Sequence, residues 1–301
     1  MDDSYTSLID KGDLYFNQGD YEKALTNYLK VVKVFPCNTI GWTKVAKTQV
    51  ILNNVEQAKK AFAEALELTT NDATIYYNYG NLLLDIKDYK TAIDCYEKSI
   101  KTDKTLALAY FNLGIAYSKL NHFDDALKAY NHFLSINPDD AEAYYHKGTL
   151  LSENNNHEKA IENYYKVLEL NPNHSAAIVN LAISLDKTGK PEESLKAYEK
   201  AISITPENST LLDNCGNTYL SMENYDKALE FFNKANKLNP LDAYPYYNRA
   251  CTYARMNNAQ KAIDDLKIAI QYHPEFKEYA KTDTDFDKIK QTQAFIELIM
   301  N

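Results

Sequence analysis

The stretch ALAYFNLGIAYSKLNHFDDALKAYNHFLSINPDD, residues 107–140, decides the fold because its pattern returns throughout the chain. Written in rows of 34 residues starting at Tyr5, the sequence gives eight complete rows that end at Phe276 without an insertion. Self-similarity at a fixed period of this length is typical of stacked repeats, in which each row is one structural unit.

Two columns of the rows hold only small residues, and a third is aromatic in every row but the last. Position 8 is Gly or Ala throughout, position 20 is Ala except for Ser194, and position 24 is Tyr or Phe except for Leu266. Small residues let two antiparallel helices approach closely, and the aromatic ring fills the volume beside their crossing. In row four these residues are Gly114, Ala126 and Tyr130. Each row is therefore predicted to be a pair of antiparallel helices.

Turn residues separate the two helices of each row. Position 32 is Pro in six of the eight rows, and proline cannot continue a helix because it lacks a backbone N–H. Position 15 is Gly or Asn in six rows, the residue types that tolerate the left-handed conformation after a helix. Between these marks the apolar residues have helical spacing, as at Leu113, Ala116 and Leu120. The pattern predicts helix, tight turn, helix, tight turn.

These columns, together with Trp42 at position 4 and Tyr117 at position 11, resemble the tetratricopeptide repeat over residues 5–276. The resemblance implies an all-α fold, a right-handed α-solenoid (superhelix) of eight helix-turn-helix repeats plus a C-terminal capping helix. Departures are Phe133 at position 27, Ser194 at position 20 and Gln49 at position 11. A tail at 1–4 precedes the repeats, which are predicted at 5–38, 39–72, 73–106, 107–140, 141–174, 175–208, 209–242 and 243–276.

The pattern stops after Pro274, and residues 277–301 are predicted to form the cap, as one or two helices. Its apolar residues have helical spacing, and Asp283 and Asp285 are candidates for a helix N-cap. A repeat array needs such a cap because its last row would otherwise expose an apolar face. The alternative is a detachable helix for a partner. The spaced apolar residues are Phe286, Ile289, Phe295, Ile296 and Ile299.

Composition narrows the possible partners and the compartment. The net charge of −9, from 33 basic and 42 acidic residues, argues against a nucleic-acid partner, which requires clustered Lys and Arg. No apolar run is long enough for membrane insertion, and the N-terminus lacks the layout of a secretory signal. The four cysteines form no CxxC pair, so we expect reduced thiols without a metal. Together these features predict a cytoplasmic protein.

No arrangement of residues indicates catalysis. The glycines belong to the repeat and its turns and form no phosphate-binding loop. The six histidines lack ligand spacing such as HExxH, and we expect them to be surface polar residues. The sequence therefore predicts a protein that is not an enzyme and that needs no cofactor.

The resemblance implies that the first helix of each pair faces an inner groove through positions 2, 5, 6, 9, 12 and 13. Position 6 is Asn in five rows, although Asn is a poor helix former. One Asn amide can bond both the N–H and the C=O of a peptide group. Similar Asn ladders, including that of the nucleocytoplasmic O-linked N-acetylglucosamine transferase, bind extended polypeptide. The column is Asn78, Asn112, Asn180, Asn214 and Asn248.

Other residues flank this column on the predicted groove. At position 9, Asn81 and Asn217 extend the polar row. At position 5, aromatic side chains are placed to cover a ligand's side chains. The alternative is that the asparagines only solvate the inner wall. The position-5 aromatics are Tyr77, Phe111, Tyr145 and Tyr247.

The sequence therefore predicts a scaffold or adaptor that binds an extended peptide segment of a partner protein. One alternative is self-assembly into a homo-oligomer through Tyr5, Leu8 and Ile9, which no preceding repeat covers. A co-chaperone that clamps a terminal carboxylate is disfavoured, because position 5 has no Lys and position 6 has no Arg. Nothing in the sequence indicates which partner is bound.

Overall fold

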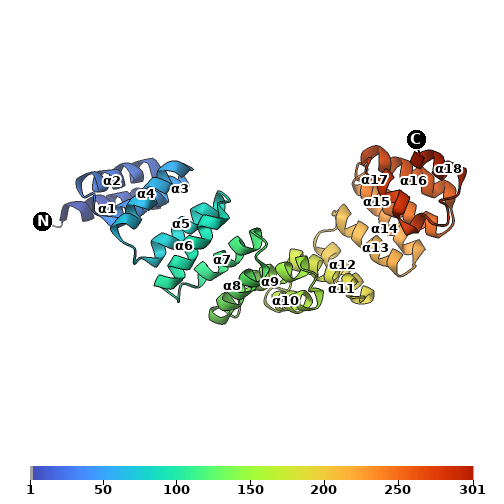
Figure 1. The fold of residues 1–301 in the computed structure, drawn as a ribbon, viewed down its shortest axis with the longest axis horizontal. Coiled ribbons are helices and arrows are strands. Elements are labelled where there is room, and N and C mark those ends of the chain that lie inside the picture. The colour runs from blue at the N-terminus through green and yellow to red at the C-terminus, as the bar shows by residue number, and fades with distance from the viewer. Residues whose placement is uncertain (1–2, 301) are drawn as a thin grey trace. The chain divides into compact units, whose positions relative to one another are not determined.

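The computed structural model describes residues 3–300, and within this range the secondary structure is helical only (Figure 1). Sixteen helices follow the eight rows, two helices to each row, which confirms the predicted all-α repeat fold. The pairs are α1 (Asp3–Asn17) and α2 (Tyr21–Val34), α3 (Thr39–Ile51) and α4 (Val55–Leu68), α5 (Ala73–Asp85) and α6 (Tyr89–Thr102), α7 (Ala107–Lys119) and α8 (Phe123–Ile136), α9 (Ala141–Glu153) and α10 (His157–Leu170), α11 (Ser175–Lys187) and α12 (Pro191–Ile204), α13 (Ser209–Ser221) and α14 (Tyr225–Leu238), and α15 (Ala243–Arg255) and α16 (Ala259–Tyr272).

The N-terminal tail predicted at 1–4 is partly helical, because α1 begins at Asp3. Met1, Asp2 and, in the predicted cap, Asn301 lie outside the described residues. The chain divides into two compact units, residues 1–150 and 151–301. No helix between residues 3 and 300 is both long enough and apolar enough to cross a membrane.

The small and aromatic columns meet inside each row. In row four the Tyr130 side chain is 1% exposed and seated against Gly114. A Cβ added at Gly114 would lie only 2.7 Å from Tyr130 Cε1, closer than two such atoms can pack. The same relation holds for Gly80 with Tyr96. Glycine at position 8 therefore provides the space for the position-24 ring, as the sequence predicted.

The turn inside each row requires a left-handed residue at position 15. This conformation occurs at Gly19 and Gly189 and at all four asparagines of the column. The two rows that lack Gly or Asn adopt it as well, with φ of 64° at Lys87 and 58° at Glu223. The turn geometry is thus a property of the whole repeat, even where the side chain disfavours it.

One contact fixes the start of α3 to the turn before it. The Trp42 indole Nε1 donates a hydrogen bond of 2.8 Å to the carbonyl of Pro36, the position-32 proline of row one. Asn38 caps the same helix, since its side chain accepts from the Gly41 N–H at 2.7 Å. These bonds hold the first turn of α3 in place.

Three short helical segments follow the last row and cover it. They are α17 (Phe276–Thr282), the 3-10 helix η1 (Thr284–Phe286) and α18 (Gln293–Met300). Phe286 and Ile289 are fully buried, and Phe295 and Ile299 nearly so, whereas Ile296 is 42% exposed. The segment packs against α15 and α16, so it buries the apolar surface that row eight would otherwise expose.

Candidate functional site

The predicted groove residues lie on the first helices, and the asparagines among them are half-buried. Asn78 and Asn81 belong to α5, Asn112 to α7, Asn180 to α11, Asn214 and Asn217 to α13, and Asn248 to α15. Several of these amides are used inside the chain. Asn78 Nδ2, for example, donates to the carbonyl of Thr74, one turn earlier in its own helix, at 2.6 Å.

In residues 1–150, polar residues at position 9 of rows one and three each bond a residue of the next row. Asn81 Oδ1 accepts from the Tyr96 hydroxyl at 2.9 Å and from Asn112 Nδ2 at 2.8 Å. Tyr96 is the buried ring of the same row, whereas Asn112 belongs to the next row. Asn112 therefore contributes a bond between rows, and its amide keeps one N–H and its oxygen for other partners.

The same arrangement occurs two rows earlier with charged residues. Asp13 Oδ1 accepts from the Tyr28 hydroxyl at 2.5 Å and from Lys44 Nζ at 2.6 Å. Asp13 and Lys44 occupy positions 9 and 6, like Asn81 and Asn112. An ion pair here thus takes the place of the amide pair.

The position-5 aromatics of this unit are packed into clusters of rings. Phe111 contacts Phe133 and His146 with centroid distances of 5.2 and 5.4 Å, and Tyr77 lies 6.2 Å from the Tyr96 ring. Burial lowers the pKa of His146, so its imidazole is neutral at physiological pH. Tyr145, half-buried on α9, meets the edge of the same imidazole. These rings are only partly available to a ligand.

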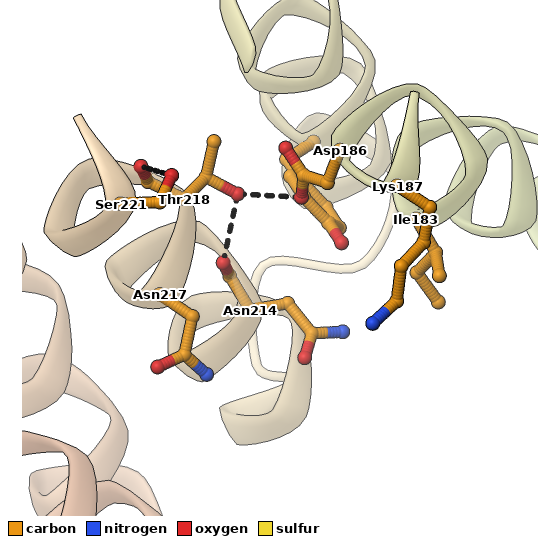
Figure 2. Close-up of a pocket in the computed structure, with 8 residues that line it drawn as sticks. Ile183, Asp186, Lys187, Asn214, Asn217, Thr218 and Ser221 are labelled. Carbon is orange, nitrogen blue, oxygen red and sulfur yellow. Dashed lines mark hydrogen bonds between the residues drawn. The ribbon is translucent and has the colours of Figure 1, made fainter. Parts of the chain in front are cut away.

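In residues 151–301, a hollow of about 360 Å³ separates α11 from α13 and holds two predicted site residues (Figure 2). Asn214 and Asn217 line it from α13, and Asp186 and Lys187 line it from α11. The Asn214 amide and the Lys187 side chain extend toward each other across the space. Among residues 3–300 the Asn214 carboxamide has no hydrogen-bond partner, so both its N–H donors and its oxygen acceptor are available to a ligand.

The far side of this hollow is held by a bond between rows. Thr218 Oγ1 donates to Asp186 Oδ2 at 2.7 Å, between position 10 of row seven and position 12 of row six. Burial raises the pKa of Asp186, while the hydroxyls of Thr218 and Ser194 oppose this shift. Ser194, the one exception to alanine at position 20, lies near Asp186, but neither its Oγ nor Asp186 Oδ1 forms a hydrogen bond within the described residues.

A buried carboxylate joins rows seven and eight. Asp213 accepts from Asn248 Nδ2 at 2.9 and 3.0 Å and from Asn217 Nδ2 at 3.3 Å, with no cation in contact among the residues described. Asp213 is only 8% exposed, and burial raises the pKa of its carboxyl group to about 6. Asn248 and Asn217 thus serve chiefly to solvate this buried group.

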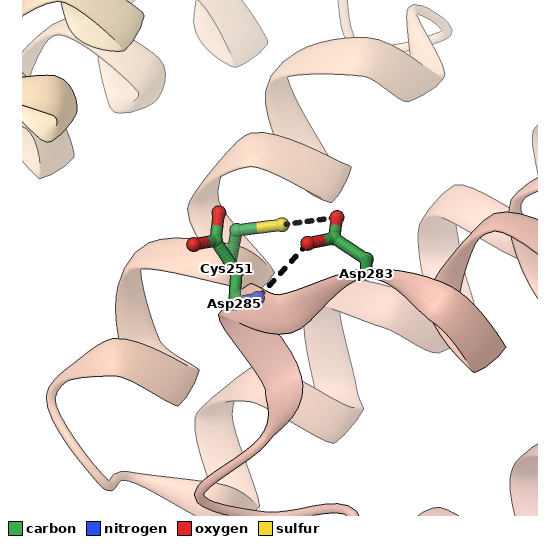
Figure 3. Close-up of side chains that lie close together, drawn as sticks. All are labelled: Cys251, Asp283 and Asp285. Atoms are coloured by element: carbon green, nitrogen blue, oxygen red, sulfur yellow. Dashed lines mark hydrogen bonds between the residues drawn. The ribbon is translucent and has the colours of Figure 1, made fainter.

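Tyr247 lies beneath the C-terminal segment and not on an open surface. It is 8% exposed, stacks on Phe276 at 4.4 Å, and donates its hydroxyl to Asp283 Oδ2 at 2.8 Å. Asp283 also contacts the Cys251 thiol at 3.7 Å (Figure 3). Tyr247 therefore anchors the cap.

The contact in Figure 3 is also a group of potential metal ligands. Cys251 Sγ and oxygens of Asp283 and Asp285 lie within 4.8 Å of one another. The carboxylates already have partners in Tyr247 and, for Asp285, in Arg255 at 3.8 Å. Burial raises the pKa of the Cys251 thiol, which keeps it protonated. The arrangement is sufficiently explained as an attachment of the cap to α15.

Sequence reasoning missed the residues that pair across rows. Asp13 with Lys44 and Asp186 with Thr218 are 31 and 32 residues apart, close to one period. A polar residue at position 9 or 12, followed in the next row by one at position 6 or 10, is the signal that would have found them.

Tetratricopeptide repeat models match residues 5–36, 72–139, 141–174 and 176–264 of the chain. The chain belongs to the tetratricopeptide repeat family. This membership indicates a scaffold that contacts other proteins.

Solved tetratricopeptide repeat structures share the fold over part of the chain. One is YrrB, described as a protein with an unusual peptide-binding site. It is 27% identical, with a TM-score of 0.56 over 62% of this chain and 95% of YrrB. Another is MamA, 28% identical, with a TM-score of 0.53 over 55% of this chain and 91% of that one.

A curated relative matches a shorter stretch. Anaphase-promoting complex subunit 3 of Schizosaccharomyces pombe is 27% identical over 89 residues, which is 30% of this chain and 13% of that protein. The match thus covers a small part of that protein.

Proposed function

We propose that this protein is a non-enzymatic adaptor whose first helices bind an extended peptide segment of a partner protein. The observation that carries the proposal is the Asn214 carboxamide, which lines the hollow between α11 and α13 and has no hydrogen-bond partner among residues 3–300. The likeness to YrrB, whose description names a peptide-binding site, supports a peptide as the ligand.

The chemistry of the hollow suits a peptide backbone. A carboxamide can donate to a peptide C=O and accept from a peptide N–H, so it binds backbone with little regard to sequence. Asn217 and the Lys187 ammonium line the same space. Since each such bond contributes about 1 kcal/mol net, and ordering an extended peptide opposes binding, we expect micromolar affinity.

The Asn column divides into two groups under this proposal. Asn112 and Asn248 are tied to acceptors in neighbouring rows and position those rows. Asn214 presents a free amide, which resembles more closely the Asn ladder expected from the sequence. The proposal includes a cytoplasmic location, because Cys37, Cys95, Cys215 and Cys251 are free thiols, which a reducing compartment preserves.

Selection of random dodecapeptides displayed on phage by the purified full-length protein would test the proposal. We expect wild-type protein to select peptides that bind with micromolar affinity in fluorescence anisotropy. Replacing Asn214 with Ala should weaken that binding by about five- to tenfold, since one buried bond contributes about 1 kcal/mol.

Asn131, exposed on the second helix α8, provides the matched control. Asn131→Ala should bind the same peptides as wild type, and both variants should keep the wild-type circular dichroism spectrum and melting temperature. The proposal is wrong if wild-type protein selects no peptide, or if Asn214→Ala binds the selected peptides as tightly as Asn131→Ala.

Self-assembly finds less support at the N-terminus than the sequence suggested. Ile9 is 9% exposed, and the Tyr5 ring packs on Phe35 with a centroid distance of 5.6 Å. Tyr5 and Leu8 are half-buried, so these residues are less exposed than the sequence suggested but keep part of their surface open. A homo-oligomer stays a prediction, and light scattering over a dilution series would test it.

A further inference from the structure

Lys47, at position 9 of row two on α3, departs from the pattern that joins the rows of residues 1–150. In rows one and three this position is an acceptor, Asp13 or Asn81, which receives a tyrosine hydroxyl and a donor from the next row. In row two the position holds an ammonium donor. The ring that would face it at position 24 is Phe62, which has no hydroxyl.

No neighbouring acceptor takes the place of the missing partner. Within residues 3–300, Lys47 forms no hydrogen bond and no ion pair. Asn78, at position 6 of the next row, donates back to Thr74. Asp72 caps α5 by accepting from the backbone N–H groups of Thr74 and Ile75 at 2.9 and 3.2 Å.

The charge on Lys47 is therefore poorly compensated. Burial lowers its pKa, the neighbouring Lys44 lowers it further, and Asp72 opposes both. Lys44 itself is neutralised by Asp13 at 2.6 Å. A half-buried ammonium has lost part of its hydration, and an anionic ligand would stabilise the charge in place of the lost water.

Open space lies on both sides of this ammonium. Lys47 lines a hollow of about 290 Å³ toward row one and another of about 470 Å³ toward row three. Asp13, the partner of Lys44, also lines the first hollow. The second is bordered by Asp72, the cap of α5, and by Ile40, whose side chain is 58% exposed. This hollow therefore offers both an ammonium group and an exposed apolar side chain to a ligand.

We propose that Lys47 binds an anionic side chain, carboxylate or phosphate, of a peptide segment that lies on the first helices of residues 1–150. The inference rests on the proposed function and adds a preference to it. Lys44 lies on the same surface, but Asp13 occupies it, so the preference depends on Lys47. Charge complementarity of this kind contributes mainly to specificity.

The test compares peptides selected from the same dodecapeptide library by wild type and by Lys47→Gln. We expect wild type to enrich Asp or Glu over the starting library and Lys47→Gln to select peptides without this enrichment. For a selected peptide, changing the acidic residue to its amide should weaken binding to wild type by about three- to tenfold. The same change should have no effect on binding to Lys47→Gln, and phosphoserine in place of the acid measures the preference between carboxylate and phosphate.

Two further variants separate charge from structure. Lys47→Arg keeps the charge and should keep the acidic preference, and Lys60→Gln, exposed on α4, should behave as wild type. If wild type selects peptides without an acidic bias, or if Lys47→Gln keeps the bias, this inference is overturned while the proposed function stands. If wild type selects no peptides, both are overturned.

Discussion

Asp13 and Asp213 are both carboxylates on first helices, yet their neighbours differ in charge. Asp13 contacts the Lys44 ammonium and the Tyr28 hydroxyl and remains partly exposed. Asp213 is buried and contacts only amides, which solvate a carboxylate less well than a cation does. A carboxylate between two rows is thus paired with a cation in one case and bonded to neutral amides in the other.

Replacing Asp213 with Asn tests this difference through pH. Burial raises the pKa of Asp213 to about 6, above its ordinary value of about 4 in an unfolded chain. The folded state therefore holds the proton more tightly, and the contribution of Asp213 to stability falls as pH rises from about 4 to about 6. Asp213→Asn should raise the free energy of unfolding at neutral pH by about 1–3 kcal/mol, and by much less below about pH 4. Urea denaturation across this range would measure both values.

Asp226, exposed in the first turn of α14, provides the control. Asp226→Asn should change stability by a similar small amount throughout the pH range. A loss of stability in Asp213→Asn that does not depend on pH would contradict the assignment.

At the residue scale, sequence reasoning located the Asn column but not the use of each amide. A column of equivalent positions shows which face of each first helix the asparagines occupy, but not which hydrogen bonds they form. Whether Asn112 is free depends on Asn81 in the row before, and whether Asn248 is free depends on Asp213, one row earlier. The packing of Tyr130 against Gly114 was predictable, because both residues lie in one row and a large ring there requires a small neighbour.

At the scale of helices, the turn at position 15 takes the same conformation whatever residue stands there. Lys87 and Glu223 have φ of 64° and 58°, a region that costs a residue with a Cβ about 1 kcal/mol relative to glycine. The packing of the paired helices therefore determines this turn. Sequence reasoning found six of these turns by residue type and could not see the two that packing enforces.

Glycine at these two turns should stabilise the fold. Lys87→Gly and Glu223→Gly should each raise the free energy of unfolding by about 0.5–1 kcal/mol, because they relieve the left-handed strain. Chemical denaturation would show this as a higher midpoint with an unchanged slope. Lys98→Gly, exposed in the middle of α6, should lower the free energy by about 1 kcal/mol. Destabilisation at both turns would show that the lysine and glutamate side chains contribute contacts of their own.

The position of the C-terminal segment, its covering role and Asp283 as a helix N-cap follow from the sequence, which predicts one or two helices where the structure has three helical segments. The spacing of Phe286, Ile289, Phe295 and Ile299 predicted burial, and all four are buried. The chain leaves the helix at Asp283, whose side chain accepts from the Asp285 N–H and contacts Cys251. Contacts with α15 thus decide where the segment bends, and these are not visible in the spacing.

At the scale of the whole molecule, contacts within residues 1–150 and within residues 151–301 connect each row mainly to its neighbours. Stability in such an array is approximately a sum of row terms and nearest-neighbour terms, so damage should stay local. The division of the chain into residues 1–150 and 151–301 agrees with this view.

Phe62→Ala tests how far a defect spreads. Phe62 is fully buried in α4, and removing its ring should lower local stability by about 3–5 kcal/mol. Hydrogen exchange followed by mass spectrometry should become faster in α3, α4 and α5 and remain unchanged in α13–α16. Acceleration in both units would mean that the chain unfolds as one cooperative body.

The chain contains a single tryptophan, and it stands on the helix that carries Lys47. Trp42 is held by its bond to the Pro36 carbonyl, five residues before the proposed anion site. All indole emission of the protein therefore arises from row two. Changes in its intensity or wavelength would report occupancy of that row without a label, independently of events elsewhere in the array.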